Sequence, residues 1–436
     1  MKGVSWRRAA AALLLLTGAV LLCELATRLA ARIGFGITPK RALAERTAFL
    51  AKIPASATTA AADQKVDRSH RRFIDMAYGA RYELHPYFGH TLFRDANHAN
   101  NQGFPTDQTY PYVKHSREFV IGIFGGSVAM QVSANSDILV ERLGPAIRKR
   151  GYDTVTVLPF AVGGWRQPQS FFALTYYLDS IDTAILVDGF NEAIQLVPEH
   201  LYTYPARFPA SDIFLPLAST ATSPYEIAEL GKLALAHEAA VRVTNALNTS
   251  LLRRSLLAHL LWRVAATRYL AYVSKLRTDH ETAAQDDWRG IERVRDDRDV
   301  EQSIESYLRY YASVVRYAAL IAHADGKLLY HFVQPNQHYR GSKPLSAEEQ
   351  QSLVTPPWFD VITPQYHRLE TMCDSLGASG VDSTFLGHLF AQTRETIYAD
   401  ACCHFNPHGV QLLENAIADH VLASAELEHL PLVREP

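Results

Sequence analysis

The stretch "VIGIFGGSVAMQ", residues 120–131, decides the fold, because an apolar run ends there in two glycines and a serine and a helix-compatible sequence comes directly after it. Apolar runs without alternation are typical of strands that are buried on both faces of a parallel sheet. Such runs recur at 119–124, 155–158, 183–187 and 328–333, with helical patterns between them. We therefore predict an α/β protein, a three-layer α/β/α sandwich with a parallel sheet.

Length and charge limit the class of protein. The chain has 436 residues, of which 48% are hydrophobic, so it can bury the core of one large or two medium domains. It carries 43 basic and 45 acidic residues, a formal net charge of -2. This balance lacks the basic excess of a nucleic-acid-binding protein, and we expect no nucleic-acid partner.

The first 31 residues have the pattern of a membrane anchor. A cationic start, 1–8, precedes an unbroken run of apolar or small residues at 9–23, and further apolar residues extend the run to 31. We predict a cytoplasmic N-terminus at 1–8 and a transmembrane signal anchor at 9–31, with the rest of the chain outside the cytoplasmic membrane. The alternative is a cleaved signal peptide. A lipoprotein site at Cys23 is disfavoured because the bulky Leu22 precedes it.

The remaining chain divides by composition. Residues 32–81 are rich in small and charged residues and suit a stalk or linker, and the folded domain is expected at 82–436. Long helical patterns at about 194–325 indicate a helical insertion in that domain. One of them, "LLAHLLWRVAATRYLAYVSKL", contains His259, Arg263 and Arg268. It therefore predicts an amphipathic helix on the core or at a membrane surface, and not a second span.

Four short motifs place reactive side chains at strand ends or beside a helix. A serine acts as a nucleophile only with a base, a group that orients the base, and donors for the oxyanion. Ser127 follows the first strand, Gly164 the second and Asn191 the third, while "YADACCHFNPHG" supplies Asp400 and His404. Taken singly, each has a structural explanation: a helix cap, a turn or a core hydrogen bond. Their succession favours a catalytic site.

The order of these motifs resembles the SGNH hydrolases, also called the GDSL esterase and lipase superfamily, in their membrane-anchored bacterial form. Supporting stretches are "NNQGF" at 100–104 and "FVQPNQHYRGSKPLSAEE" at 332–349. The resemblance covers 82–436 apart from the insertion, and it implies a flavodoxin-like sheet. It also implies that Ser127 is the nucleophile, His404 the general base and then acid, and Asp400 the residue that orients the imidazole. Ser127, Gly164 and Asn191 would form the oxyanion hole.

Two positions depart from the family pattern. Gly126 stands where the family usually has an aspartate before the serine, which is not a triad member. Three residues lie between Asp400 and His404, whereas the family usually has two. An added residue rotates the Asp400 carboxylate relative to the imidazole ring of His404 unless the loop bulges. The role of Asp400 therefore depends on the conformation of this loop.

The resemblance implies a serine-dependent carboxyl-ester hydrolase or O-acyltransferase. It would act in the periplasm of a bacterium, held by a single-pass anchor in the inner membrane, on small acyl groups such as acetyl on cell-surface polysaccharide. A membrane-bound O-acyltransferase or an export complex is the expected protein partner. The alternative is a catalytically inactive SGNH-like domain that binds polysaccharide or serves as a scaffold, and the insertion could be a docking surface for partners.

No metal and no organic cofactor is expected. Cys373 could form a disulfide with Cys402 or Cys403 in an oxidising compartment, and the sequence does not assign the pairing. A zinc site at Cys402 and Cys403 is disfavoured, because structural zinc ligands are usually separated by two to four residues.

Overall fold

The computed structural model describes residues 19, 21–30, 37–52, 82–93, 99–197, 201, 206–210, 213–214, 224–288, 297–354 and 356–428. Seven strands lie in these ranges: β1 (Tyr82–His85), β2 (Gly89–Leu92), β3 (Glu118–Gly125), β4 (Thr154–Ala161), β5 (Thr183–Asp188), β6 (Leu328–Val333) and β7 (Ser383–Phe385). The helices that matter below are α2 (Pro39–Lys52), α4 (Ser127–Ala134), α5 (Asp137–Arg148), α6 (Gln169–Tyr177), α7 (Phe190–Gln195), α10 (Pro224–Thr249), α11 (Leu256–Trp288), α12 (Asp297–Ala324), α13 (Pro356–Ala378) and α14 (Pro407–Ala423).

The protein is built on a five-stranded parallel sheet in the order β4-β3-β5-β6-β7. Its first four strands in the chain are the apolar runs that the sequence predicts. β3, β5 and β6 are buried along their whole length, as expected of central strands with helices on both faces. β4 lies at an edge and is exposed at its start, and its position accommodates Pro159, which has no N–H to donate.

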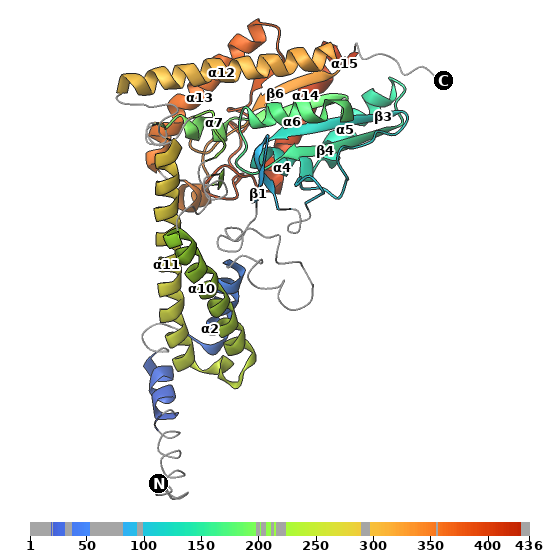
Figure 1. Ribbon diagram of the computed structural model, residues 1–436. Coiled ribbons are helices and arrows are strands. Elements are labelled where there is room, and N and C mark those ends of the chain that lie inside the picture. Colours follow the sequence, from blue (N-terminus) through green and yellow to red (C-terminus); the bar gives the residue numbers. More distant parts are fainter. Residues whose placement is uncertain are drawn as a thin grey trace, which may run out of the picture. The chain divides into compact units, whose positions relative to one another are not determined.

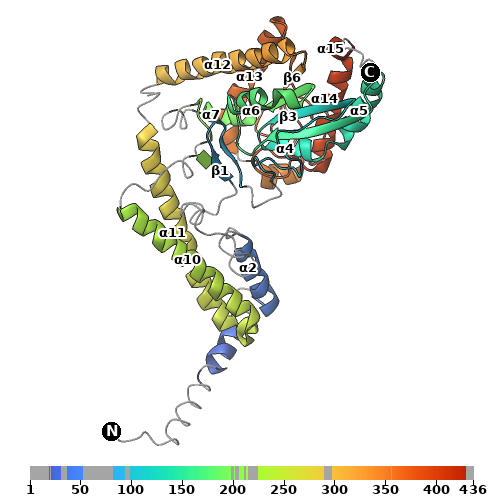
Figure 2. The ribbon, with the colours of Figure 1, turned by 45° about the vertical axis from the view of Figure 1, so that its right-hand side comes forward.

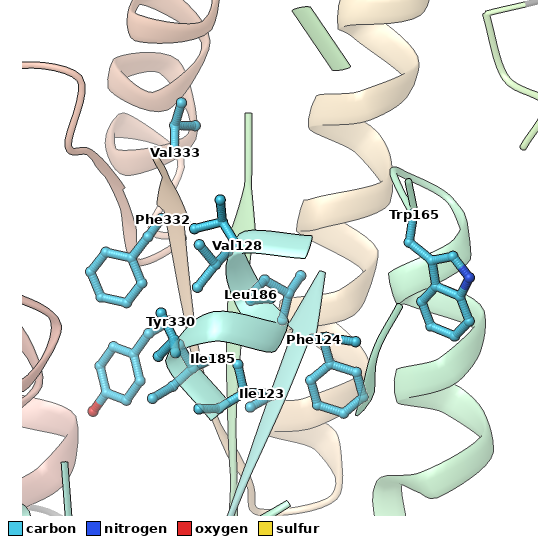
Figure 3. Close-up of a cluster of buried hydrophobic side chains, with 14 of the residues drawn as sticks. Ile123, Phe124, Val128, Trp165, Ile185, Leu186, Tyr330, Phe332 and Val333 are labelled. Carbon is cyan, nitrogen blue, oxygen red and sulfur yellow. The ribbon is translucent and has the colours of Figure 1, made fainter. Parts of the chain in front are cut away.

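The core lies between the central strands and the helices. In Figure 3, apolar side chains of β3, β5 and β6 lie together around the sheet. The labelled ones from these strands are Ile123, Phe124, Ile185, Leu186, Tyr330, Phe332 and Val333. The register explains this contact, because Ile123 pairs with Ile185 and Ile185 pairs with Tyr330 across the sheet.

The helices form two groups around the sheet (Figure 1). One group consists of α4, α5 and α14: α14 packs on α4 and α5, α4 packs on β3, β4 and β5, and α5 packs on β4. The other consists of α6, α12 and α13, with α12 packed on β6 and on both other helices. The arrangement is an α/β fold consistent with three layers. A small antiparallel hairpin, β1–β2, precedes the sheet and was not predicted.

The chain divides into two compact units, Met1–Ala80 with Ser219–Thr282 and Arg81–Ala218 with Ala283–Pro436. In the first unit, α10 and α11 run side by side, as both ribbon views show, and α2 packs against α10 (Figure 2). Phe49, Val241 and Trp262, one from each helix, share its apolar core. Part of the predicted stalk, 39–52, is thus a packed helix, while α12 of the predicted insertion belongs to the unit that contains the sheet.

The predicted cytoplasmic segment, 1–8, and most of the predicted anchor, 9–31, lie outside the described residues. Residues 21–30 are helical. None of the helices that the structure describes is long and apolar enough to cross a membrane.

Candidate active site

The candidate site lies at the carboxyl edge of the sheet. β3 comes first in the chain among the strands of this sheet, and it lies between β4 and β5. The chain therefore adds β4 on one side of β3 and the later strands on the other side. Ligands of open α/β sheets bind outside the carboxyl ends of the strands at such a switch point. Ser127 follows β3, Gly164 follows β4, and Asn191 follows β5. These three predicted residues therefore come to one edge of the sheet.

Ser127 is the first residue of α4, and Gly126 before it is the N-cap. The serine is therefore not the capping residue, which was the structural alternative. The Ser127 side chain lies beside the thiol of Cys403, which is on the loop that also carries His404. Within the described residues no hydrogen bond joins Ser127 to the imidazole of His404. The serine therefore lies beside the loop of the proposed base, but the two side chains are not hydrogen-bonded to each other.

Asn191 lies against the turn that presents Ser127. Its Nδ2 donates to the carbonyl of Trp165 at 2.7 Å, and it would be 2.3 Å from a Cβ on Gly126. A side chain at position 126 would therefore require this amide to move. Gly164, the residue before Trp165, has φ +78°, a conformation that favours glycine. The two predicted oxyanion loops thus meet beside Ser127.

Asp400 and His404 form the second half of the site. His404 Nδ1 lies 2.5 Å from Asp400 Oδ2, so the added residue between them does not separate the pair. The loop curls around the carboxylate, whose Oδ1 accepts the N–H groups of Cys402, Cys403 and His404 at 2.9, 3.2 and 3.3 Å. Burial raises the pKa of Asp400, but these hydrogen bonds, first that from His404, outweigh burial and leave the pKa below its ordinary value.

Gln131 connects the two halves. It lies one helical turn after Ser127 on α4, its Nε2 donates to the carbonyl of Phe405 at 2.9 Å, and its Oε1 accepts the Phe405 N–H at 3.1 Å. Phe405 directly follows His404. The helix that begins with the nucleophile therefore holds the backbone beside the base. Sequence analysis did not select Gln131, although its spacing of four from Ser127 places both residues on one helix face.

The loop after β6 supports Asp400 from the other side. Gln337 Nε2 donates to the Asp400 carbonyl at 2.8 Å, and Asn336 Nδ2 donates to the Cys402 carbonyl at 3.2 Å. Further along, the buried Lys343 pairs with Glu349, whose other oxygen accepts the N–H of Ile397 at 2.8 Å. The stretch at 332–349 thus fixes the chain just before the Asp400 loop.

A buried acidic group lies behind the oxyanion loops. Glu192, 1% exposed, accepts the N–H of Gln167 at 3.0 Å and that of Gly189 at 2.7 Å, so one carboxylate ties together the segments after β4 and β5. Burial, together with the charge of Asp188, raises the pKa of Glu192 to about 8. The buried His331 lies 3.5 Å from Asp188, and although burial lowers its pKa, the hydrogen bonds to Asp188 and Cys373 raise it to about 9. Glu192 was not selected from the sequence, although it directly follows Asn191.

All four cysteines are free thiols. Cys402 Sγ and Cys403 Sγ lie 3.3 Å apart, while Cys373 is buried in the core beside His331. Neither of the two disulfides that the sequence left open is formed.

The site therefore joins a serine at a helix start, an aspartate-supported histidine, and an amide beside the serine. Such groups can activate a hydroxyl, move a proton and hold a developing negative charge. A comparison of the chain with known protein families finds no family that matches, and a search of curated proteins finds no match either.

Proposed function

We propose that this protein is a serine-dependent carboxyl-ester hydrolase or O-acyltransferase of the SGNH type, with a flavodoxin-like sheet. The observation that carries the proposal is the bridge from Gln131 to Phe405, because it joins the helix of Ser127 to the loop of the Asp400–His404 pair. When the five strands of the sheet are numbered 1 to 5 along the chain, starting at β3, their order in space is 2-1-3-4-5. This order, and the position of the site at the switch point, support the same class.

In the proposed mechanism His404 takes the proton of Ser127 through Nε2, since Asp400 occupies Nδ1. The hydroxyl oxygen then attacks an ester carbonyl. The N–H groups of Ser127 and Gly164 and the Asn191 amide stabilise the oxyanion, and His404 returns the proton to the leaving alcohol. Water or a sugar hydroxyl accepts the acyl group from the serine. The mechanism requires the Ser127 hydroxyl to reach the imidazole, and catalytic hydrogen bonds commonly form only in the substrate complex.

The substrate and location rest on the resemblance and the N-terminal sequence. We infer a bacterial inner-membrane protein whose site faces the periplasm and removes or transfers small acyl groups, such as acetyl, on cell-surface polysaccharide. A membrane-bound O-acyltransferase or export complex would be its partner. The described end of the predicted anchor supports this, because Glu24 accepts the N–H of Leu256 at 2.9 Å and Arg28 donates to the Arg254 carbonyl at 3.1 Å. Charged side chains paired with a polar turn suit a helix end that leaves the bilayer.

One observation favours a second function. The Ser127 hydroxyl lies beside the Cys403 thiol, and among the described residues it makes no hydrogen bond to His404. A site held in this arrangement would not activate the serine, and the domain would then bind polysaccharide or organise an export complex without catalysis.

The test is covalent labelling of the detergent-solubilised chain with a fluorophosphonate probe, read by mass spectrometry. We expect one adduct, on Ser127, that Ser127→Ala abolishes. Ser133→Ala is the matched control, because Ser133 lies on the same helix and donates only to the Met130 carbonyl at 3.0 Å. The protein should also release acetate from acetylated oligosaccharide before, but not after, reaction with the probe. Folded protein that takes no label, with a probe proven on a known esterase, would refute catalysis and leave the binding function.

A further inference from the structure

Cys402, Cys403 and His404 form a cluster that the proposed mechanism uses only in part. The two sulfur atoms and one imidazole nitrogen all lie within 4.8 Å of one another. Adjacent side chains of an extended chain point to opposite sides. Here the backbone curls around Asp400 Oδ1, which accepts three successive N–H groups, and the two thiols come together at 3.3 Å. The loop conformation therefore brings the two adjacent thiols close enough to bind one ion, which an extended chain would prevent.

The donor set suits a thiophilic cation. Two thiolates and an imidazole are ligands that zinc and cadmium prefer. Tetrahedral geometry with sulfur at about 2.3 Å from zinc sets the two sulfurs roughly 3.8 Å apart, so the thiols need to separate by only about half an ångström. Asp400 bonds to His404 Nδ1, which is the usual outer partner of a histidine that binds metal. Nε2 is then the nitrogen that faces a ligand.

We propose that Cys402, Cys403 and His404 bind one thiophilic divalent cation, Zn²⁺ or Cd²⁺, with the fourth position open beside Ser127. On binding, the two thiols release their protons to solvent, and no oxidant is involved. The cation occupies His404 Nε2 and thereby stops this ring from taking the proton of Ser127. Binding stands on the cluster alone. Inhibition rests on the proposed function, since it needs Ser127 and His404 to act together.

The test of binding is a titration of the solubilised full chain with Cd²⁺, with a phosphine reductant to keep the thiols free. We expect an ultraviolet thiolate-to-cadmium band that saturates at one ion per chain, and Zn²⁺ should displace the ion. Cys402→Ser and Cys403→Ser should each weaken binding at least tenfold. Cys23→Ser is the matched control, because Cys23 is an exposed thiol outside the cluster. Absence of the band in the unaltered chain at tenfold excess of Cd²⁺ refutes the site without any variant.

The test of inhibition is the rate at which the fluorophosphonate labels Ser127 with and without Zn²⁺. We expect at least a tenfold slower reaction with the metal, and recovery on addition of a chelator. A saturated site with an unchanged labelling rate refutes inhibition while the proposed function stands. If neither form is labelled, the proposed function fails, and the cadmium band still decides whether the cation site exists.

Discussion

Glu414 provides a quantitative test of the electrostatics around α14, the helix that follows the His404 loop. Its side chain is fully buried, and neither carboxylate oxygen has a hydrogen-bond partner among the described residues. Burial, aided by the negative charge of Asp137, raises its pKa from 4.5 to about 8. The folded protein therefore holds this carboxyl protonated at neutral pH, whereas the unfolded chain ionises it.

The sign and size of the effect come from linkage. Below pH 4.5 both states are protonated and Glu414 has no pH-dependent effect. Between pH 4.5 and 8 the unfolded state alone is ionised, so the stability of the wild-type protein falls as pH rises, by about 1.4 kcal/mol for each pH unit. Glu414→Gln has nearly the same shape and no ionisation. We expect the variant to be more stable by roughly 3 kcal/mol at pH 7 and by almost nothing at pH 4.

The assay is urea denaturation of both proteins at pH 4, 5.5 and 7. Glu141→Gln is the matched control, because Glu141 is an exposed glutamate on the nearby helix α5. Asp137→Asn should reduce the pH dependence, since it removes the charge that helps to raise the pKa of Glu414. A Glu414→Gln variant that is less stable than wild type at pH 7 would mean that the carboxylate is ionised and paired, and the reasoning would be refuted.

Three further predictions concern the site. Gln131→Leu removes both hydrogen bonds to the Phe405 backbone, and we expect unfolding by urea to show a loss of about 2–4 kcal/mol, with slower labelling of Ser127. Glu192→Gln leaves one acceptor oxygen for two buried N–H groups, so the free energy of unfolding should fall by about 1–3 kcal/mol; an unchanged value would show that the bridge between the loops contributes nothing. Asp400→Asn removes the charge that holds His404, and we expect kcat for ester hydrolysis to fall by roughly two to four orders of magnitude without loss of fold by circular dichroism. Equal kcat would remove Asp400 from the catalytic group.

The parts of the fold that the sequence predicts are those with the strongest apolar signal. β3, β5 and β6 are buried throughout, so their runs had no competing interpretation. β7 has only three half-buried residues. β1 is half-buried along its whole length and β2 is buried at three of its four positions, so neither strand of the hairpin shows an alternating pattern. Such short strands form because a neighbour is already in place, which is information that a local pattern lacks.

The site shows the same division. Ser127, Gly164 and Asn191 were predictable because each comes just after a strand, and parallel strands end at one edge of the sheet. The position of Ser127 beside Cys403 was not predictable, because this thiol belongs to a loop that is distant in the sequence. The contact of Gln131 with Phe405 spans 274 residues of sequence, and the shared acceptor at Asp400 reverses the usual alternation of adjacent side chains. The Gln131–Phe405 contact and the curled backbone around Asp400 depend on the conformation of the loop and not on the residue types alone.

The bridge from Gln131 to Phe405 also sets when the site can exist during synthesis. The two residues are 274 positions apart, and ribosomes add about 5–20 residues per second, so the loop of His404 emerges on the order of tens of seconds after the helix of Ser127. Throughout that interval the nascent chain holds a serine without its base. A site assembled from such distant halves is incomplete on the ribosome and in any unfolded export state, so the proposed activity needs no separate inhibitor before folding is complete.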